Sequence, residues 1–286
     1  MAEVEVALKP GRTAAMKIPF VKSQAVGNDF LIVQWADLEE CGLTEGDMAP
    51  LARRICDRRL GIGADGLEVV YAGAGDDCAE LRLFNSDGSE AEISGNGTRC
   101  VAAWLTWKNG GPGEIRLRTK AGTKQLRLLR AGGSQFEFAM NMGRPSWRAE
   151  DLDCRLDTSA GTHTASLINV GNPQCVLFVD DFDFDWRSLG REIESLSRFP
   201  ARTNVSFARV LGRAAIEARF WERGAGETLS SGTGSTGAAA AAILTRRCDS
   251  PIRIVTPAGE MRLRWDDEIT LEGAAAIVGA GDYFRE

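Results

Sequence analysis

The sequence predicts a mixed α/β (α+β), strand-rich fold made of two similar halves. Glycine accounts for 32 of the 286 residues, above the usual share of about 7%. Most of these glycines stand in four short loops, and each loop lies between runs with strand or helix spacing. Two of the loops repeat each other along the chain, which predicts a duplicated domain.

Short runs of alternating apolar and polar residues predict most of the strands. These runs occupy residues 80–84, 114–119, 124–129, 135–140, 165–170, 214–221, 252–256 and 261–265. Two longer runs place apolar residues on one helical face. We expect helices over Thr44–Arg58, which begins with a threonine cap, and over Asp185–Ser197, which Pro200 ends.

The internal repeat consists of two pairs of matching segments. Residues 94–98 (Ser-Gly-Asn-Gly-Thr) align without gaps with residues 231–235 (Ser-Gly-Thr-Gly-Ser), 137 positions further along. Residues 26–28 and 170–172 both read Val-Gly-Asn and are 144 positions apart. Two matches in the same order predict pseudo-twofold halves that meet at a cleft. The best candidate for the join is Met142–Pro145.

Each repeated serine-glycine loop follows a strand pattern and is expected to begin a helix. The first helix stops at Asn109-Gly110-Gly111, where glycine suits a helix C-terminus. The second is rich in alanine and runs to Arg246 and Arg247, whose charges suit a helix end.

Backbone N–H groups at a helix N-terminus form a site for an anion. Neither loop carries the lysine of a phosphate-binding P-loop. Residues 232–237 spell the dinucleotide pattern G-x-G-x-x-G, but the loop at Gly95 lacks the third glycine, so a dinucleotide is not expected. The loops therefore predict a small anion such as a carboxylate, with Ser94 and Ser231 on either side.

The composition argues against several classes of protein. The net charge is −6 and no basic stripe is present, so we expect no nucleic-acid partner. The longest uncharged apolar run, Gly237–Leu244, is far shorter than the ~20 residues of a membrane span, so we expect no membrane partner. Residues 1–9 contain no secretory apolar region, which predicts a cytoplasmic protein.

Cysteine and histidine usage argues against a metal centre. The seven cysteines have no C-x-x-C spacing, and free thiols in a reducing compartment are expected. His163 is the one histidine of the chain, so a histidine-ligated metal is not expected.

Six motifs cover the chain from about Met16 to Glu286. They are FVK with GNDF at 20–30, RLGIGADG at 59–66, FNSDGSEAEISGNGTRC at 84–100, VGNPQCV at 170–176, RTNV at 202–205 and ERGAGETLSSGTG at 222–234. Together they resemble diaminopimelate epimerase, of the cofactor-independent amino-acid racemase superfamily.

The resemblance implies two similar halves, each a strand-rich layer or barrel around a central helix. On this basis the N-terminal half is residues 16–141 plus 274–286, the C-terminal half is residues 142–273, and residues 1–15 are a disordered extension. It also implies a homodimer that needs no cofactor. The implied reaction inverts one α-carbon of LL-2,6-diaminopimelate to give the meso form, on the route to lysine and peptidoglycan.

The resemblance also implies which residues bind the amino-acid substrate. The reacting α-carboxylate would lie at the two glycine turns, and the distal amino-acid head would be held by a clamp of amides with one Glu and one Arg. The reacting end corresponds to Asn28, Gly95, Asn96, Gly232 and Thr233, and the distal end to Asn85, Asn172, Asn204, Glu222 and Arg223.

The departures from the family fall on the chemistry itself. Ser94 and Ser231 occupy the positions of the two cysteines that move the α-proton in the family, and a hydroxyl is a far weaker acid than a thiol. Gln174 stands where the family has a histidine, and His163 is expected to be structural. Turnover by this chain is therefore expected to be weak or absent.

Other potential bases are expected to be structural. Cys100 and Cys175 have the setting of buried apolar residues. Four carboxylates in glycine loops are expected to hold turns, with Asp87 the first to test as a base. They are Asp29, Asp65, Asp87 and Glu227.

Three functions remain open at this point. In the first hypothesis the chain is an epimerase, either with its two cysteines replaced by serine or with serines that work in another way. Alternatively, it is a naturally diverged racemase or one-base dehydratase of the superfamily, or an amino-acid-binding pseudoenzyme. Gln174 favours natural divergence, whereas the intact distal clamp favours diaminopimelate as the ligand.

Overall fold

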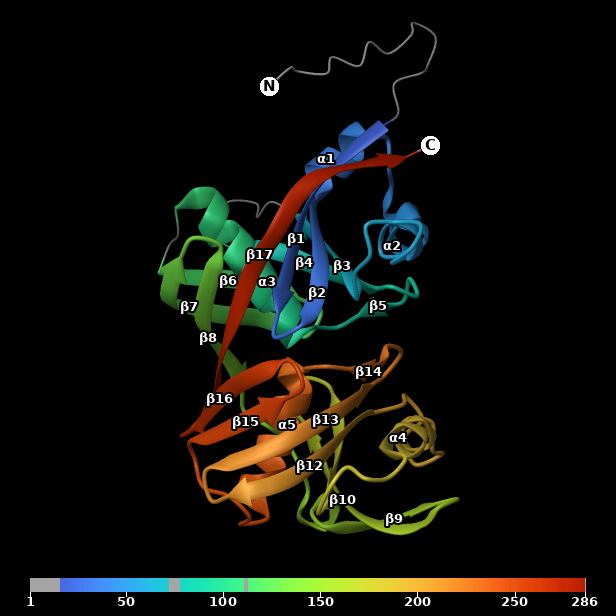
Figure 1. The fold of residues 1–286 in the computed structure, drawn as a ribbon, viewed down its shortest axis with the longest axis vertical. Coiled ribbons are helices and arrows are strands. Elements are labelled where there is room, and N and C mark those ends of the chain that lie inside the picture. The colour runs from blue at the N-terminus through green and yellow to red at the C-terminus, as the bar shows by residue number, and fades with distance from the viewer. Residues whose placement is uncertain (1–15, 72–77, 111–112, 286) are drawn as a thin grey trace, which may run out of the picture.

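A computed structural model describes residues 16–71, 78–110 and 113–285 of the chain (Figure 1). The extension expected at residues 1–15 lies outside the described residues, as does Gly111. The helices are α1 (Trp35–Glu40), α2 (Met48–Ile55), α3 (Gly95–Asn109), α4 (Trp186–Glu194) and α5 (Gly232–Leu244), with 3-10 turns at Glu45–Asp47 and Ala149–Asp151. The strands are β1 (Met16–Ala25), β2 (Asn28–Gln34), β3 (Gly66–Tyr71), β4 (Cys78–Asn85), β5 (Glu90–Ala91), β6 (Glu114–Thr119), β7 (Gly122–Gly132), β8 (Gln135–Gly143), β9 (Cys154–Thr158), β10 (Gly161–Asn169), β11 (Pro173–Phe178), β12 (Asn204–Gly212), β13 (Ala215–Glu222), β14 (Gly226–Thr228), β15 (Ile252–Thr256), β16 (Gly259–Trp265) and β17 (Ile269–Arg285).

The N-terminal half is a closed barrel. Its cycle of eight paired strands runs β1–β2–β3–β4–β6–β7–β8–β17 and back to β1. The β2–β3 and β4–β6 pairs are parallel, and the other pairs are antiparallel. Closure leaves none of these strands with an open edge.

The C-terminal half repeats this plan. Its strands pair in the order β10–β11–β12–β13–β15–β16–β17, again with two parallel pairs, β11–β12 and β13–β15. A bridge between Ser146, just beyond β8, and Asn169 of β10 completes the ring. The predicted α+β fold of two pseudo-twofold halves is confirmed.

The two Val-Gly-Asn segments occupy equivalent turns in the two halves. Val26 and Gly27 connect β1 to β2, and Val170 and Gly171 connect β10 to β11. Val26, Gly27 and Gly171 all take positive φ angles, which suits a tight connection between antiparallel strands.

A helix fills the centre of each barrel. In α5 every residue from Gly232 to Ala242 is buried, and in α3 every residue from Gly95 to Trp104 is buried. Each helix contacts strands on several sides of its ring. A helix that is buried on all sides has no solvent-facing polar side, which explains the alanine run of α5. Both helices share one continuous apolar core.

Strand β17 ties the halves together. Its 17 residues pair first with β16, then with β8 and finally with β1, and Figure 1 shows it crossing from the lower lobe to the upper one. The exact boundaries between the two halves, at residues 141/142 and 273/274, stay a prediction.

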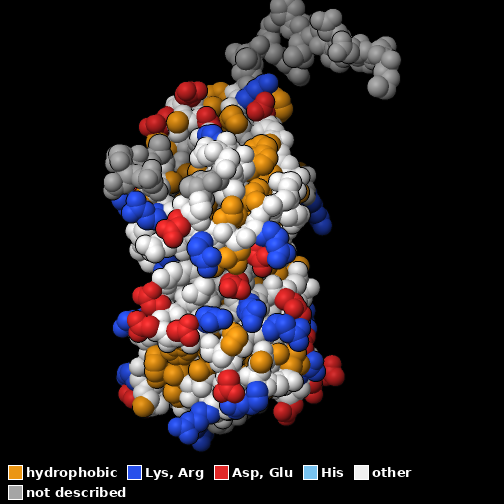
Figure 2. Space-filling model, turned by 90° about the vertical axis from the view of Figure 1, so that its left-hand side faces the viewer, with side chains coloured by type: hydrophobic (Ala, Val, Ile, Leu, Met, Phe, Trp, Pro, Cys, Tyr) orange, Lys and Arg blue, Asp and Glu red, His pale blue; other side chains and the backbone are white. Residues whose placement is uncertain are grey.

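Outside the barrels, α2 and α4 occupy equivalent places. Helix α2 packs on β3 and β4, and α4 packs on β12 and β13, each over its own apolar cluster. Figure 2 shows the surface of the two lobes, where acidic and basic side chains are interspersed.

The predicted helix over Thr44–Arg58 is wrong at both ends. Residues Glu45–Asp47 form a 3-10 turn, in which Thr44 and Asp47 bond reciprocally, and α2 begins only at Met48. The helix stops at Ile55 because the following loop folds back, so that the Ile55 carbonyl accepts from the N–H groups of residues 62 and 63.

The other predicted helix ends also shift. Helix α4 covers Trp186–Glu194, with Asp185 as an N-cap that accepts from the Ser188 N–H. Helix α5 ends at Leu244 because Arg246 takes a φ of 58° and the Arg247 N–H returns to the Ala242 carbonyl.

The N-termini of α3 and α5 abut through two glycines. A Cβ atom added to Gly232 would lie 2.9 Å from the Cα atom of Gly95, and one added to Gly95 would lie 3.1 Å from the Cα atom of Gly232. Both contacts are with backbone, which cannot swing aside as a side chain can. Glycine is therefore required where the two central helices meet.

We expect Gly232→Ala to lower the free energy of unfolding by about 1–3 kcal/mol, because the added methyl group overpacks two backbones. The loss should occur despite the higher helix propensity of alanine. Urea titration measures it, with Gly132→Ala as the control, since nothing lies within 4 Å of a Cβ there. Equal unfolding midpoints for the two variants would contradict the argument.

Candidate active site at the junction of the helices

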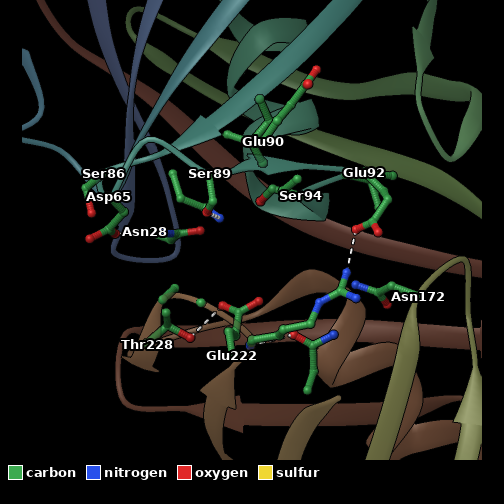
Figure 3. A pocket seen from close by; sticks show the side chains of 18 of the residues that line it. Asn28, Asp65, Ser86, Ser89, Glu90, Glu92, Ser94, Asn172, Glu222 and Thr228 are labelled. Carbon is green, nitrogen blue, oxygen red and sulfur yellow. Dashed lines mark hydrogen bonds and ion pairs between the residues drawn. The ribbon is translucent and has the colours of Figure 1, made fainter. Parts of the chain in front are cut away.

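A cleft of about 300 Å³ lies where the two halves meet (Figure 3). The predicted site residues that line it are Asn28, Asn85, Ser94, Asn172, Asn204, Glu222 and Arg223. The remaining predicted residues are buried and are not among those that line the cleft, and these are Gly95, Asn96, Ser231, Gly232 and Thr233. The fold therefore brings residues from both repeats to one place.

Ser94 and Ser231 are the N-caps of the two central helices, as the repeat predicts. The Ser94 Oγ accepts from the Gly97 N–H, and the Ser231 Oγ accepts from the Gly234 N–H, both at 3.0 Å. Each serine is thereby fixed at the first turn of its helix.

The first backbone N–H groups of the two helices remain available. In the described residues, the N–H groups of residues 95 and 96 in α3 and of 232 and 233 in α5 have no acceptor. The helix dipoles add positive potential at the same point. The junction therefore has the donors and the potential to hold a carboxylate.

Ser231 has a carboxylate partner. Its hydroxyl donates to Glu222 Oε2 at 2.8 Å, and the Thr228 hydroxyl donates to Glu222 Oε1 at 2.6 Å. Burial raises the pKa of the Glu222 carboxyl, although these two hydrogen bonds favour the ionised form. A carboxylate with a raised pKa next to a serine hydroxyl can accept the proton of that hydroxyl.

Ser94 lacks such a partner. It lines the cleft, and its Oγ accepts from Gly97, while no acceptor for its own proton lies among the described residues. In Figure 3, Ser94 projects from the N-terminal half and Glu222 from the C-terminal half. The two serines are equivalent in the fold but differ in their chemical surroundings.

Arg223 forms an ion pair across the cleft. Its Nη2 lies 2.6 Å from Glu92 Oε2 of the other half, and its Nη1 donates to the Ala201 carbonyl at 3.1 Å (Figure 3). The Arg223 N–H also donates to Asn204 Oδ1 at 3.0 Å. A ligand carboxylate that binds Arg223 must share the guanidinium with Glu92 or displace it.

The amides of the expected distal clamp already have partners. Asn85 Nδ2 donates to Ser89 Oγ at 3.0 Å, and Asn204 Nδ2 donates to the Pro173 carbonyl at 3.0 Å. These bonds hold both side chains in place at the cleft wall.

Gln174 is buried and bonds to a site residue. Its Nε2 donates to Asn172 Oδ1 at 2.6 Å, and it does not line the cleft. His163 lies on the β9–β10 hairpin, 3.1 Å from Thr158 Oγ1, and is also absent from the cleft wall. The structure therefore places the histidine of the chain away from the site.

The other potential bases are held by local contacts. Asp87 Oδ1 accepts hydrogen bonds from the N–H and the hydroxyl of Ser89, and Glu227 forms an ion pair with Arg187. Burial raises the pKa of the Cys100 thiol to about 12 and also raises that of Cys175. The carboxylate bonded to a cap serine is Glu222, which the family resemblance places in the distal clamp, whereas the sequence analysis named Asp87 as the first base to test.

The family follows from comparison with known proteins. The sequence model described as diaminopimelate epimerase matches residues 20–148 and 166–281. The chain belongs to the diaminopimelate epimerase family. Diaminopimelate epimerase of Moorella thermoacetica is 37% identical over 282 residues, covering 92% of this chain and 98% of the relative. The Synechocystis enzyme of that name is 35% identical, with 93% and 99% covered.

Solved structures with the same fold include other isomerases. A hydroxyproline epimerase from Agrobacterium vitis superposes with a TM-score of 0.71 at 15% identity, over 93% of this chain and 91% of that one. A Bacillus anthracis protein of the phenazine biosynthesis PhzF family gives 0.65 at 15% identity, over 93% and 98%. Membership of the diaminopimelate epimerase family makes this chain an isomerase of the epimerase and racemase type.

The sequence patterns missed three site contacts. Asp65 bonds to Asn28, Glu92 pairs with Arg223, and Thr228 bonds to Glu222. Glu92 stands two residues before Ser94 and Thr228 three before Ser231, and both lie in motifs quoted for the family resemblance, which is the signal that could have found them. No group of three or more His, Cys, Asp or Glu side chains suited to a metal occurs within the described residues. No described helix has the length and apolarity to cross a membrane.

The pKa of Glu222 tests the contact with Ser231. Because the hydroxyl stabilises the ionised carboxylate, Ser231→Ala should raise this pKa further. Ser94→Ala is the matched control and should leave it unchanged. A ¹³C NMR titration of the labelled carboxyl measures the shift, and an equal effect of both variants would contradict the assigned contact.

Proposed function

We propose that this chain binds LL-2,6-diaminopimelate and inverts one of its α-carbons to give the meso form. The relatives that carry the name diaminopimelate epimerase support this substrate. A cytoplasmic homodimer without a cofactor stays a prediction from the sequence.

The observation that carries the proposal is the contact between the N-termini of α3 and α5, which Ser94 and Ser231 cap. The reacting α-carboxylate would accept from the free N–H groups of α3 and α5. The two helix dipoles would then stabilise the negative charge that develops when the α-proton leaves. This geometry suits an α-carbon held between two proton-transfer groups.

The proton transfers follow from the different partners of the serines. Ser231 Oγ takes the α-proton while its own proton passes to Glu222 Oε2. The Ser94 hydroxyl, whose proton has no acceptor in the described residues, supplies a proton to the opposite face. Ser94 then takes a proton from solvent and Glu222 releases one. The product therefore carries a proton derived from solvent.

The distal amino-acid head would occupy the part of the cleft around Arg223. Its carboxylate would bind the guanidinium, and its ammonium group would lie near Glu92, which Arg223 now contacts. The family resemblance implies Glu222 at this distal end, but Glu222 is bonded to Ser231 and Thr228.

A second candidate is an amino-acid-binding protein without turnover. The observation that favours it is serine at both proton-transfer positions, because a serine hydroxyl is a poor base even with a carboxylate nearby. A diverged racemase for another amino acid stays open for the same reason. Binding and proton exchange must therefore be measured separately.

Isothermal titration calorimetry should detect binding of diaminopimelate, and Arg223→Ala should weaken it by about 1.5–3 kcal/mol, the range for a hydrogen bond to a charged group. Arg213→Ala is the control, since Arg213 pairs with Asp249 and does not line the cleft. Equal affinity for norleucine, which lacks the distal head, would rule out the assigned ligand.

We expect slow or undetectable epimerisation by the chain as it stands, and faster turnover in Ser94→Cys/Ser231→Cys. A thiol with a pKa of about 8.5 supplies a base near neutral pH, whereas a serine hydroxyl does not. Recovery should be partial, because Gln174 replaces the histidine that the family resemblance implies.

Deuterium incorporation at the α-carbon in D₂O, followed by ¹H NMR, measures this exchange. Ser195→Cys is the control, because Ser195 is exposed at the end of α4. Rapid exchange by the unchanged chain, with no gain in the double variant, would overturn the expectation.

A further inference from the structure

Arg99 is a fully buried cation without a carboxylate partner. Its side chain is 0% exposed, and no ion pair to it forms within the described residues. Glu68 is also fully buried but does not pair with it. Burial lowers the pKa of Arg99 to about 10. Because burying an unpaired charge is costly, the contacts that Arg99 does make call for an explanation.

Arg99 begins a chain of hydrogen bonds that ends at the cleft. Its Nη2 donates to Asn96 Oδ1, and Asn96 Nδ2 donates to Asn28 Oδ1 at 3.3 Å and to the Ser230 carbonyl at 3.1 Å. Asn28 Nδ2 then donates to Asp65 Oδ2 at 2.6 Å. The bond to Ser230 crosses to the other half of the molecule.

The two ends of this chain have fixed polarity. A guanidinium can only donate and an ionised carboxylate can only accept, whereas an asparagine amide does either according to its orientation. Arg99 therefore forces the Asn96 oxygen towards itself, and Asp65 forces the Asn28 NH₂ towards itself. The Ser230 carbonyl, which can only accept, favours the same orientation of Asn96. With both ends fixed, the orientation of both amides between them is determined.

This orientation decides what Asn28 presents to a ligand. One of its amide protons goes to Asp65 and its oxygen accepts from Asn96, which leaves the second amide proton available at the cleft wall. A reversed amide would instead present its oxygen, which repels a ligand carboxylate. Figure 3 shows Asn28 and Asp65 together at the edge of the cleft.

We propose that Arg99 and Asp65 are positioning residues that lock Asn28 and Asn96 in one orientation, so that Asn28 donates to a carboxylate oxygen of the ligand. This inference rests on the proposed function in one respect, the carboxylate ligand. The orientation itself is independent of any ligand.

In the C-terminal half, the equivalent series of hydrogen bonds has no end of fixed polarity. Gln174 Nε2 donates to Asn172 Oδ1, and Asn172 Nδ2 donates to Thr233 Oγ1 at 3.3 Å. A glutamine amide and a hydroxyl can each reverse their roles, and Gln174 Oε1 has no partner in the described residues. A ligand therefore meets one fixed amide, Asn28, and one adaptable amide, Asn172.

NMR of the Asn28 side-chain amide in the ligand-free protein tests the lock. The ¹⁵N-asparagine signals are assigned by their loss in Asn28→Asp. We expect one pair of Asn28 amide protons, one of them shifted downfield by the Asp65 carboxylate. Arg99→Gln, whose amide can accept as well as donate, should add a second set of signals, whereas Arg99→Lys, which only donates, should keep the single set.

Asp65→Asn tests the other end of the hydrogen-bond chain. Because Asp65 is partly exposed, this variant should fold even if Arg99→Gln, at a fully buried position, does not. It should also produce a second set of Asn28 signals. A single unchanged set in Asp65→Asn, or in a folded Arg99→Gln, would overturn the proposal.

A second experiment measures the affinity for diaminopimelate by calorimetry and tests whether the orientation of Asn28 matters for ligand binding. Arg99→Gln should weaken it by about threefold to tenfold, as expected for one hydrogen bond, and Arg99→Lys should restore it. Equal affinity of Arg99→Gln and the unchanged chain would refute the role in ligand binding. If the unchanged chain does not bind diaminopimelate, the proposed function fails, while the NMR arm still decides the orientation.

Discussion

The contact between Gly95 and Gly232 is the constraint on which the site depends. Two helices, each enclosed in its own barrel, meet at their N-termini with no side chain between their backbones. Any larger residue would separate the helices, and with them the four free N–H groups and the two serine caps. The barrels are therefore joined at the candidate site, and the cleft opens beside that contact.

This contact has an electrostatic consequence. Each helix N-terminus carries about half a positive charge, so two of them placed together repel each other. The surrounding acceptors offset part of this repulsion: the serine caps accept from their own helices, and Glu222 lies beside the second cap. A bound carboxylate offsets more of it. The pseudo-twofold packing thus brings four N–H donors to one point, which is the arrangement that the proposed carboxylate would use.

Symmetry of the fold does not extend to the chemistry. Ser231 is bonded to Glu222, whereas Ser94 has no carboxylate partner within the described residues. Asn28 bonds to Asn96 and to the Asp65 carboxylate, whereas Asn172 bonds to the Gln174 amide and the Thr233 hydroxyl, which can each reverse their roles. A reaction that moves a proton from one face of a carbon to the other uses a base on one side and an acid on the other. The duplicated scaffold supplies the two cap serines, and the unlike partners supply the difference between them.

Local patterns in the sequence determined the repeat, the helix starts at Ser94 and Ser231 and the Val-Gly-Asn turns, because caps and turns depend on hydrogen bonds between residues a few positions apart. They placed the helix ends less well, since the loop after Ile55 ends α2 through contacts that spacing does not reveal. The pairing of Arg223 with Glu92, the direction of the Arg99 to Asp65 chain and the closure of each barrel were decided by tertiary structure. Except for Arg99 and Asn96, which lie three positions apart on α3, these partners are distant in the sequence, and only the folded structure determines which polar groups meet.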